Sequence, residues 1–164
     1  MIIRPYTPAD KPGCISAFES NMPRFFAPAE LEDYSRWLDG LAIRDEPEAG
    51  IDNYFVAEND GRVIGCGGFY LDREKQEATM AWGLISNEHH KKGWGKELFM
   101  YRLNVIRSLC ARCRVILDTT QHSFPFFEKI GFNVVKITKD FYGEGLDRYD
   151  MELLPATEQS ESAS

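Results

Sequence analysis

The sequence from residue 80 to residue 101 reads MAWGLISNEHHKKGWGKELFMY, and it contains the turn that decides the fold. Residues 80–85 are mostly apolar, which is typical of a short buried strand. After the turn, apolar residues recur at spacings of three and four, which predicts an amphipathic helix. They are Leu98, Tyr101, Leu103, Val105, Ile106 and Leu109. Gly93 and Gly95 lie between the two elements, where the lack of a Cβ lets backbone approach a ligand closely.

The turn is expected to bind an anion. It opens a helix whose first N–H groups have no partner inside the helix and carry the positive end of its dipole. Lysine side chains add positive charge at Lys91, Lys92 and Lys96. We therefore predict a phosphate-binding site at the N-terminus of this helix.

The loop departs from two common nucleotide-binding patterns. Leu98 stands where the third glycine of G-x-G-x-x-G would be, and Glu97 replaces the Ser or Thr of the P-loop. The loop instead resembles the pyrophosphate-binding motif of the GNAT superfamily of acyl-CoA-dependent N-acyltransferases, Q/R-x-x-G-x-G/A. Its three fixed positions correspond to His90, Gly93 and Gly95, with His90 in place of the usual Gln or Arg.

Composition fits one globular domain. The chain has 164 residues, of which 43% are hydrophobic and 13% aromatic, enough for a single core. The formal net charge of -7 argues against a nucleic-acid-binding surface, which needs clustered Lys and Arg. No apolar run approaches the ~20 residues of a membrane helix, and residues 1–5 show no secretory signal. We expect a cytoplasmic protein that contacts neither nucleic acid nor membrane.

The four cysteines are Cys14, Cys66, Cys110 and Cys113. Cys110 and Cys113 have the spacing of a redox motif, but they lie at a predicted helix end and no second pair supports a metal site. We predict thiols that pack in the core and no bound metal. Redox or zinc chemistry is the alternative.

Hydrophobic periodicity and turn residues predict elements in the order β-α-α-β-β-β-α-β-α-β-β. Strands are expected at residues 2–6, 53–58, 62–70, 77–85, 114–119, 132–137 and 148–154. Helices are expected at residues 8–20 and 29–43, after the glycine loop, and at residues 124–130. Asp60-Gly61 predicts a hairpin. The glycines within one strand, Gly65, Gly67 and Gly68, predict a bulge or close packing.

This order is that of the GNAT fold, and the resemblance covers residues 1–154. It implies an α/β (α+β) protein with a mixed central sheet of about seven strands, flanked by about four helices and splayed at the central strands. We expect residues 1–154 to form a single domain. The acidic residues 45–50 are expected to form a solvated loop, and the polar residues 155–164 a disordered tail.

A second GNAT pattern, N-x-x-A-x-x-x-Y-x-x-x-G-F, also has a counterpart. Thr120 stands at its Asn, Ser123 at its Ala and Phe127 at its Tyr, and Gly131-Phe132 match outright. The resemblance implies that Thr120, Ser123 and Phe127 contact the cofactor.

The resemblance implies acetyl-CoA as co-substrate. In this family pantetheine pairs with the exposed edge of the strand before the glycine loop, here Gly83, Leu84 and Ile85. The pyrophosphate is then expected on the loop itself, at His90, Lys91, Lys92, Gly93, Trp94, Gly95 and Lys96. The alternative for Lys91 and Lys92 is an exposed pair at a helix start, which is electrostatically unfavourable without an anion.

The resemblance further implies direct attack of an amine on the thioester, without an acyl-enzyme. In many members a Tyr on the last helix protonates the departing thiolate, but Phe127 occupies that position and has no proton to give. His122 is a candidate in its place, because histidine exchanges protons near neutral pH. The alternatives are that His122 is a surface residue beside a helix start, or that the thiolate leaves unaided.

The general base is equally open. Some family members use a Glu on the central strand, and Thr79 stands at that position here. Glu77 lies two residues away on the same face and is a candidate, acting directly or through water. The alternatives are that Glu77 is a solvated strand residue and that a water chain carries the proton to bulk.

Aromatic residues are expected to form the wall of the acceptor site. Phe25 and Phe26 lie in a proline-flanked loop, and Tyr142 precedes a glycine-rich turn. Tyr34 and Trp37 are further candidates, although their helical spacing is more typical of core residues.

The sequence therefore predicts an N-acetyltransferase that moves an acetyl group from acetyl-CoA to a primary amine of a small molecule, peptide or protein. The alternative is a catalytically silent acyl-CoA-binding sensor or interaction module, which Phe127 and the missing central-strand Glu favour. The acceptor is not determined, because specificity does not transfer with a fold. An exposed terminal strand leaves a homodimer open.

Overall fold

The computed structural model describes residues 1–43 and 50–155. Apart from Gly50 and Pro155, the predicted solvated loop (45–50) and disordered tail (155–164) lie outside the described residues. The described strands are β1 (Ile2–Pro5), β2 (Gly50–Asn59), β3 (Arg62–Asp72), β4 (Glu77–Ile85), β5 (Arg114–Thr119), β6 (Asn133–Gly143) and β7 (Leu146–Leu153). The helices are α1 (Lys11–Glu19), α2 (Glu30–Ile43), α3 (Trp94–Leu109) and α4 (Phe124–Ile130), with short 3-10 turns η1 (Pro8–Asp10) and η2 (Asn87–His89).

The strands form one mixed sheet in the order β1-β2-β3-β4-β5-β7-β6. All neighbouring pairs are antiparallel except β4 and β5, which are parallel. A parallel pair needs a long crossover connection, and α3 provides it. The predicted fold class, a mixed seven-stranded sheet with four helices, is confirmed for the described residues.

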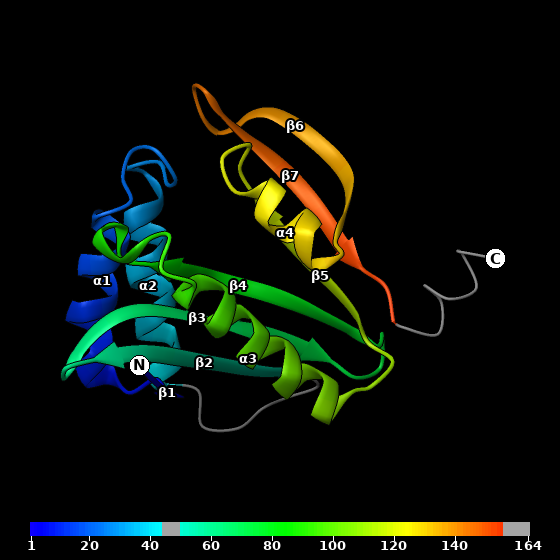
Figure 1. Cartoon of the computed structure of the whole chain (residues 1–164), viewed down its shortest axis with the longest axis horizontal. Coiled ribbons are helices and arrows are strands. Elements are labelled where there is room, and N and C mark those ends of the chain that lie inside the picture. Colours follow the sequence, from blue (N-terminus) through cyan, green and yellow to red (C-terminus); the bar gives the residue numbers. More distant parts are fainter. Residues whose placement is uncertain (44–49, 156–164) are drawn as a thin grey trace.

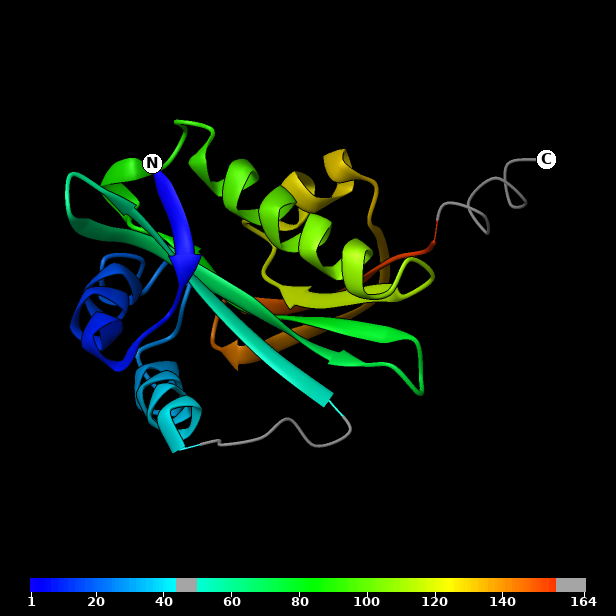
Figure 2. The same ribbon diagram turned by 90° about the horizontal axis from the view of Figure 1, so that it is seen from below.

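The four described helices pack on the sheet in two pairs, one pair on each face. Figure 2 shows α1 and α2 on one face and α3 and α4 on the other. Strand alternation supplies both cores, because successive side chains point to opposite faces. On β2, Tyr54 and Val56 pack in the α1/α2 core, whereas Phe55 packs in the α3/α4 core. Tyr34 is fully buried and Trp37 packs against the same α1/α2 core, so neither forms an acceptor wall.

The sheet is splayed at its centre, as predicted. β4 and β5 pair only from Glu77 opposite Arg114 to Thr79 opposite Ile116. Beyond Thr79 the strands separate, and Figure 1 shows them together at one end and apart at the other. The register between β3 and β4 shifts between Cys66 and Gly68, where β4 has one residue more than β3, so this bulge lies on β4, opposite the glycines.

Three local predictions need correction. The first helix begins as the 3-10 turn η1 before α1, and β6 continues to Gly143 instead of ending at residue 137, so Tyr142 lies on a strand. Cys110 and Cys113 form a disulfide and are not core thiols, because the end of α3 brings their Cα atoms to 5.5 Å. The prediction holds for Cys14 and Cys66, which are buried free thiols.

The described helices also bear on the membrane prediction. No helix in the described part of the chain is long and apolar enough to cross a membrane.

Candidate active site

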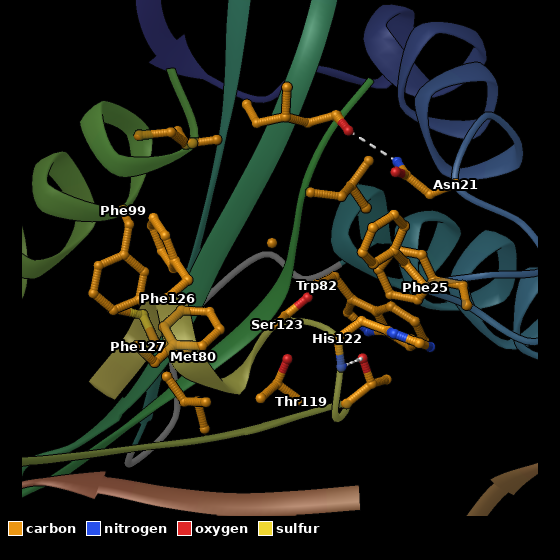
Figure 3. Close-up of a pocket in the computed structure, with 18 of the residues that line it drawn as sticks. Asn21, Phe25, Met80, Trp82, Phe99, Thr119, His122, Ser123, Phe126 and Phe127 are labelled. Atoms are coloured by element: carbon orange, nitrogen blue, oxygen red, sulfur yellow. Dashed lines mark hydrogen bonds between the residues drawn. The ribbon is translucent and has the colours of Figure 1, made fainter. Parts of the chain in front are cut away.

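A cleft of about 820 Å³ lies where β4 and β5 separate. Its walls come from the α1–α2 connection, β4 and the loop after it, α3, the end of β5, α4 and β6. Figure 3 shows Phe99, Phe126 and Phe127 along one side of the cleft and Phe25, Trp82 and His122 along the other. The cleft therefore lies between the α1/α2 side and the α3/α4 side of the molecule, where β4 and β5 separate.

The glycine loop presents unpaired backbone donors at the cleft. Lys91 and Gly93 have positive φ angles of 64° and 80°, so the chain turns sharply before α3. The first N–H of α3 that bonds inside the helix is that of Glu97, which donates to the Gly93 carbonyl at 3.1 Å. The preceding N–H groups, of residues 94–96, have no hydrogen-bond partner among the described residues and lie at the positive end of the helix dipole. This geometry fits an anionic group such as a pyrophosphate.

Most residues predicted to bind the cofactor line the cleft. They are Gly83, Leu84, Ile85, His90, Lys91, Gly93, Gly95, Lys96, Thr120, Ser123 and Phe127. Lys92 and Trp94 do not line it. Instead Trp94 stacks on His89, with ring centres 5.2 Å apart, and the Lys92 Nζ lies 5.3 Å from the Trp94 ring centre.

The end of β4 is held by two side chains that meet at one carbonyl oxygen. The Asn21 Nδ2 donates to the Ile85 oxygen at 2.9 Å, and the His90 Nε2 lies 2.9 Å from the same oxygen. The His90 side chain therefore anchors the loop to β4. Sequence reasoning missed Asn21, which is buried and far from Ile85 in the chain.

Phe25 contacts both the loop after β4 and the loop after β5. Its ring packs edge-on against His90 at 5.3 Å and against His122 at 5.9 Å between ring centres. His122 follows β5, and its backbone N–H donates to the Thr120 Oγ1 at 3.3 Å (Figure 3). The structure thus brings the predicted residues Phe25 and His122 together in the cleft, with Phe26 also in its lining.

The other two predicted catalytic residues lie outside the cleft. Glu77 Oε2 accepts a hydrogen bond from Arg114 Nη2 at 2.6 Å, at the far end of β4. Thr79 lies where β4 is still paired with both β3 and β5. Met80 is the first β4 residue in the lining, so both Glu77 and Thr79 lie before the point at which β4 and β5 separate.

Part of the cleft lining is acidic. Glu30, Asp118 and the predicted acceptor residue Tyr142 belong to it, and the Tyr142 hydroxyl donates to the Asp118 carboxylate. Burial raises the pKa of Glu30, and the negative charges of Asp118 and Asp33 raise it further, although a hydrogen bond from the Ala27 N–H opposes this. Sequence reasoning missed Glu30 and Asp118, because each lies next to Tyr142 only in the folded chain.

The fold and the cleft have the arrangement expected of an acyl-CoA-dependent acyltransferase. A model of the acetyltransferase (GNAT) family matches residues 15–132, most of the chain. The chain therefore belongs to the acetyltransferase (GNAT) family, which confirms the resemblance seen in the sequence. That family is one of acetyltransferases.

Among curated proteins, the chain is similar to two amino-acid acetyltransferases. It is 28% identical over 102 residues to that of Aeromonas salmonicida, covering 60% of this chain and 23% of that protein. It is 30% identical over 94 residues to that of Vibrio cholerae, covering 57% of this chain and 21% of that protein. The matched segment is thus less than a quarter of each relative.

Solved structures share the fold across nearly the whole chain. A Desulfovibrio desulfuricans protein described as an acetyltransferase of the GNAT family has a TM-score of 0.77 at 20% identity, covering 94% of this chain and 99% of that one. Ribosomal-protein-alanine N-acetyltransferase from Brucella melitensis has a TM-score of 0.71 at 17% identity, covering 94% and 99%. An aminoglycoside 6'-N-acetyltransferase complexed with coenzyme A has a TM-score of 0.70 at 14% identity, covering 94% and 97%.

Proposed function

We propose that this protein transfers an acetyl group from acetyl-CoA to the amino group of an acceptor by direct attack of the amine on the thioester. One observation carries the proposal: two groups of opposite charge line a single cleft. Lys91, Lys96 and the start of α3 form the basic group, and Glu30 and Asp118 form the acidic group. The basic group suits a pyrophosphate, and the acidic group suits a protonated amine.

The cofactor is proposed to lie along the β4 wall. Its pyrophosphate would rest on the backbone of the glycine loop, and its pantetheine arm along Gly83 and Leu84, which line the cleft where β4 has no β5 partner. When bound, acetyl-CoA supplies the activated acyl group as a thioester. The protein supplies the orientation of that thioester between the two walls.

The acceptor is proposed to be a cationic amine held by the acidic part of the lining. Glu30 and Asp118 attract it electrostatically, and the Tyr142 hydroxyl keeps the Asp118 carboxylate in place. The two curated relatives are named for amino acids, so the α-amino group of an amino acid or peptide is one candidate. A small polyamine and an amino sugar are others.

His122 is proposed to carry protons in this reaction. An amine attacks only after losing a proton, and the sulfur that leaves must be stabilised. His122 lines the cleft beside Phe25. We propose no catalytic role for Glu77 or Thr79, because neither lines the cleft.

The test is calorimetric titration of the purified protein with acetyl-CoA, beside the variants Gly93→Asp and Gly61→Asp. The two glycines are closely matched, since their φ angles are 80° and 76° and an added Cβ at either meets nothing within 4 Å. Only Gly93 lines the cleft. We expect a dissociation constant near ~1 μM for the wild type (of order 8 kcal/mol), at least a tenfold loss in Gly93→Asp, and wild-type affinity in Gly61→Asp.

If the folded wild type does not bind acetyl-CoA, the proposal is contradicted. Equal loss in both variants would show that backbone strain, rather than the charge in the cradle, causes the effect. Neither result is compatible with a cofactor held by this loop.

The second candidate function is a silent acyl-CoA sensor, which Phe127 favours because this cleft residue has no ionisable group. Release of free CoA thiol, measured with a panel of amino acids, peptides, polyamines and amino sugars, separates the two. Acceptor-dependent release supports the enzyme, and tight binding without release supports the sensor.

A further inference from the structure

A buried arginine that sequence reasoning missed lies in the wall of the cleft. Arg102 is on α3 and is only 5% exposed, yet it lines the same cavity as the glycine loop. Two glycines make room for its guanidinium. A Cβ at Gly67 would lie 2.8 Å from the Arg102 Cζ, and a Cβ at Gly83 would lie 2.6 Å from its Nη2. Strands β3 and β4 are therefore both shaped around this side chain.

The guanidinium has few partners for a buried cation. Arg102 Nη1 donates to the Gly68 carbonyl at 3.1 Å and lies 3.8 Å from the Met80 sulfur, while Nε has no partner in the part of the chain that the structure describes. None of the ion pairs among the described residues includes Arg102. A buried charge is normally paired with an opposite charge. Arg102 departs from this rule, because its guanidinium lies in the cleft wall without a carboxylate partner among the described residues.

This charge persists at neutral pH. Burial lowers the pKa of Arg102 to about 10, which still leaves the group protonated. The titratable groups that act on it from neighbouring strands are Tyr54 on β2 and Cys66 on β3, a phenol and a thiol. The hydrogen bond to the Gly68 carbonyl accounts for a hydrogen-bond donor at this position. It does not account for the positive charge, because a neutral donor would serve that carbonyl equally well.

The part of the wall next to Arg102 is apolar. Phe99, Phe126 and Phe127 are apolar and cannot give a proton. Arg102 lies next to them, because its Cζ is 5.3 Å from the centre of the Phe99 ring, and the Phe99 and Phe127 ring centres are also 5.3 Å apart. Electrostatic stabilisation is strong in such an apolar site.

We propose that Arg102 is a catalytic residue whose guanidinium stabilises the CoA sulfur as a thiolate. This inference rests on the proposed function. In the transfer, the amine nitrogen bonds to the carbonyl carbon, the carbon–sulfur bond breaks and its electron pair stays on sulfur. The proton lost by nitrogen passes to His122. The positive charge of Arg102 compensates the negative charge on sulfur until solvent protonates it.

The experiment measures the ionisation of the thiol in bound CoA, which does not depend on turnover. Ultraviolet difference absorbance of the thiolate is followed against pH for CoA bound to the wild type, Arg102→Met and Arg102→Lys. We expect the midpoint in the wild type to lie at least about one pH unit below that of free CoA. Arg102→Met should remove this shift, and Arg102→Lys should restore part of it.

Three outcomes overturn the proposal. A wild-type midpoint equal to that of free CoA does so without any variant, even where Arg102→Met does not fold. Equal midpoints in the wild type and a folded Arg102→Met do so as well. The third outcome is that the wild type binds succinyl-CoA more tightly than butyryl-CoA and that Arg102→Met loses this preference. The guanidinium would then bind a carboxylate of the acyl group instead of the sulfur. Failure of the wild type to bind CoA at all is a different result, because it removes the proposed function itself.

Discussion

The side-chain amide of Asn21 donates a 2.9 Å hydrogen bond to the carbonyl oxygen of Ile85, and this bond ties the end of α1 to the end of β4. The same Nδ2 also donates to the Ala17 carbonyl at 2.9 Å, so one buried amide joins a helix end to a strand end. Because His90 meets the same Ile85 oxygen, the start of the glycine loop is fixed from two directions.

The first prediction concerns this bond. Asn21→Ala leaves the Ile85 carbonyl with His90 alone, and we expect it to cost about 1 to 2 kcal/mol of unfolding free energy. It should also weaken acetyl-CoA binding about tenfold, equivalent to about 1.4 kcal/mol, because the loop loses one anchor. Urea denaturation and calorimetric titration measure the two effects. Asn104→Ala, at an exposed site on α3, is the control; it should leave binding unchanged and should not lower the unfolding free energy, because alanine favours a helix.

The second prediction concerns the bulge on β4. The Tyr54 hydroxyl donates to the Trp82 carbonyl at 2.8 Å, and Trp82 has a positive φ of 41°. The Tyr34 hydroxyl lies 2.8 Å from that of Tyr54 and therefore donates to it. Tyr54→Phe should lower the unfolding free energy by about 1 to 3 kcal/mol, because two buried groups lose a partner.

The matched control for Tyr54→Phe is Tyr70→Phe, at a side chain that is 39% exposed. Urea denaturation of both variants should show a shifted midpoint for the first alone. Equal stabilities of Tyr54→Phe and the wild type would mean that the hydroxyl does not hold the bulge.

Local patterns determined much of the fold in advance. The glycine loop, β4, β5 and α4 follow from periodicity and turn residues, which depend only on neighbours in the chain. The splay and its exposed edge at Gly83, Leu84 and Ile85 were implied by family resemblance, but the residue at which it begins was not. Glu77 and Thr79 were placed in the site, yet β4 leaves β5 only after Thr79. The point of separation depends on how α3 and α4 pack, and no local pattern reports it.

The missed site residues have the same explanation. Arg102 occupies a position on α3 where an apolar residue would continue the helical stripe, and its environment comes from Gly67 on β3 and Gly83 on β4. Glu30 and Asp118 interact electrostatically although they come from α2 and β5. Such groups acquire their function from contacts between distant segments, so a single sequence does not single them out.

The third prediction contrasts two glycines. A Cβ at Gly68 would lie 1.9 Å from the Asn53 carbonyl oxygen, which is backbone and cannot turn away. Gly68→Ala should therefore lower the unfolding free energy by about 3 kcal/mol. At Gly95 the nearest atom is an Ile85 side-chain carbon at 3.6 Å, an ordinary contact. Gly95→Ala should leave thermal stability unchanged or raise it by at most about 1 kcal/mol. Equal destabilisation by the two variants would contradict this reading.

The last prediction concerns pH and the anchor of β1. The Asp10 carboxylate accepts hydrogen bonds from both Nη atoms of Arg4 and from the Thr7 N–H, each at 2.8 Å. The hydrogen bonds from Arg4 lower the pKa of Asp10, and burial only partly opposes them. Asp10 thus holds β1 against η1 in its charged form.

The sign of the pH effect follows from that direction. The folded-state pKa of Asp10 lies below its unfolded value of about 3.9, so the unfolded chain takes up the proton first as pH falls. The stabilisation is complete above the unfolded pKa and is lost as pH falls through the folded pKa. Asp10→Asn should therefore cost about 2 kcal/mol at pH 7 and progressively less below about pH 4. Urea midpoints at several pH values measure this, with Asp33→Asn, at an exposed acid, as the control. A cost that is independent of pH would show that Asp10 acts through its shape rather than through its charge.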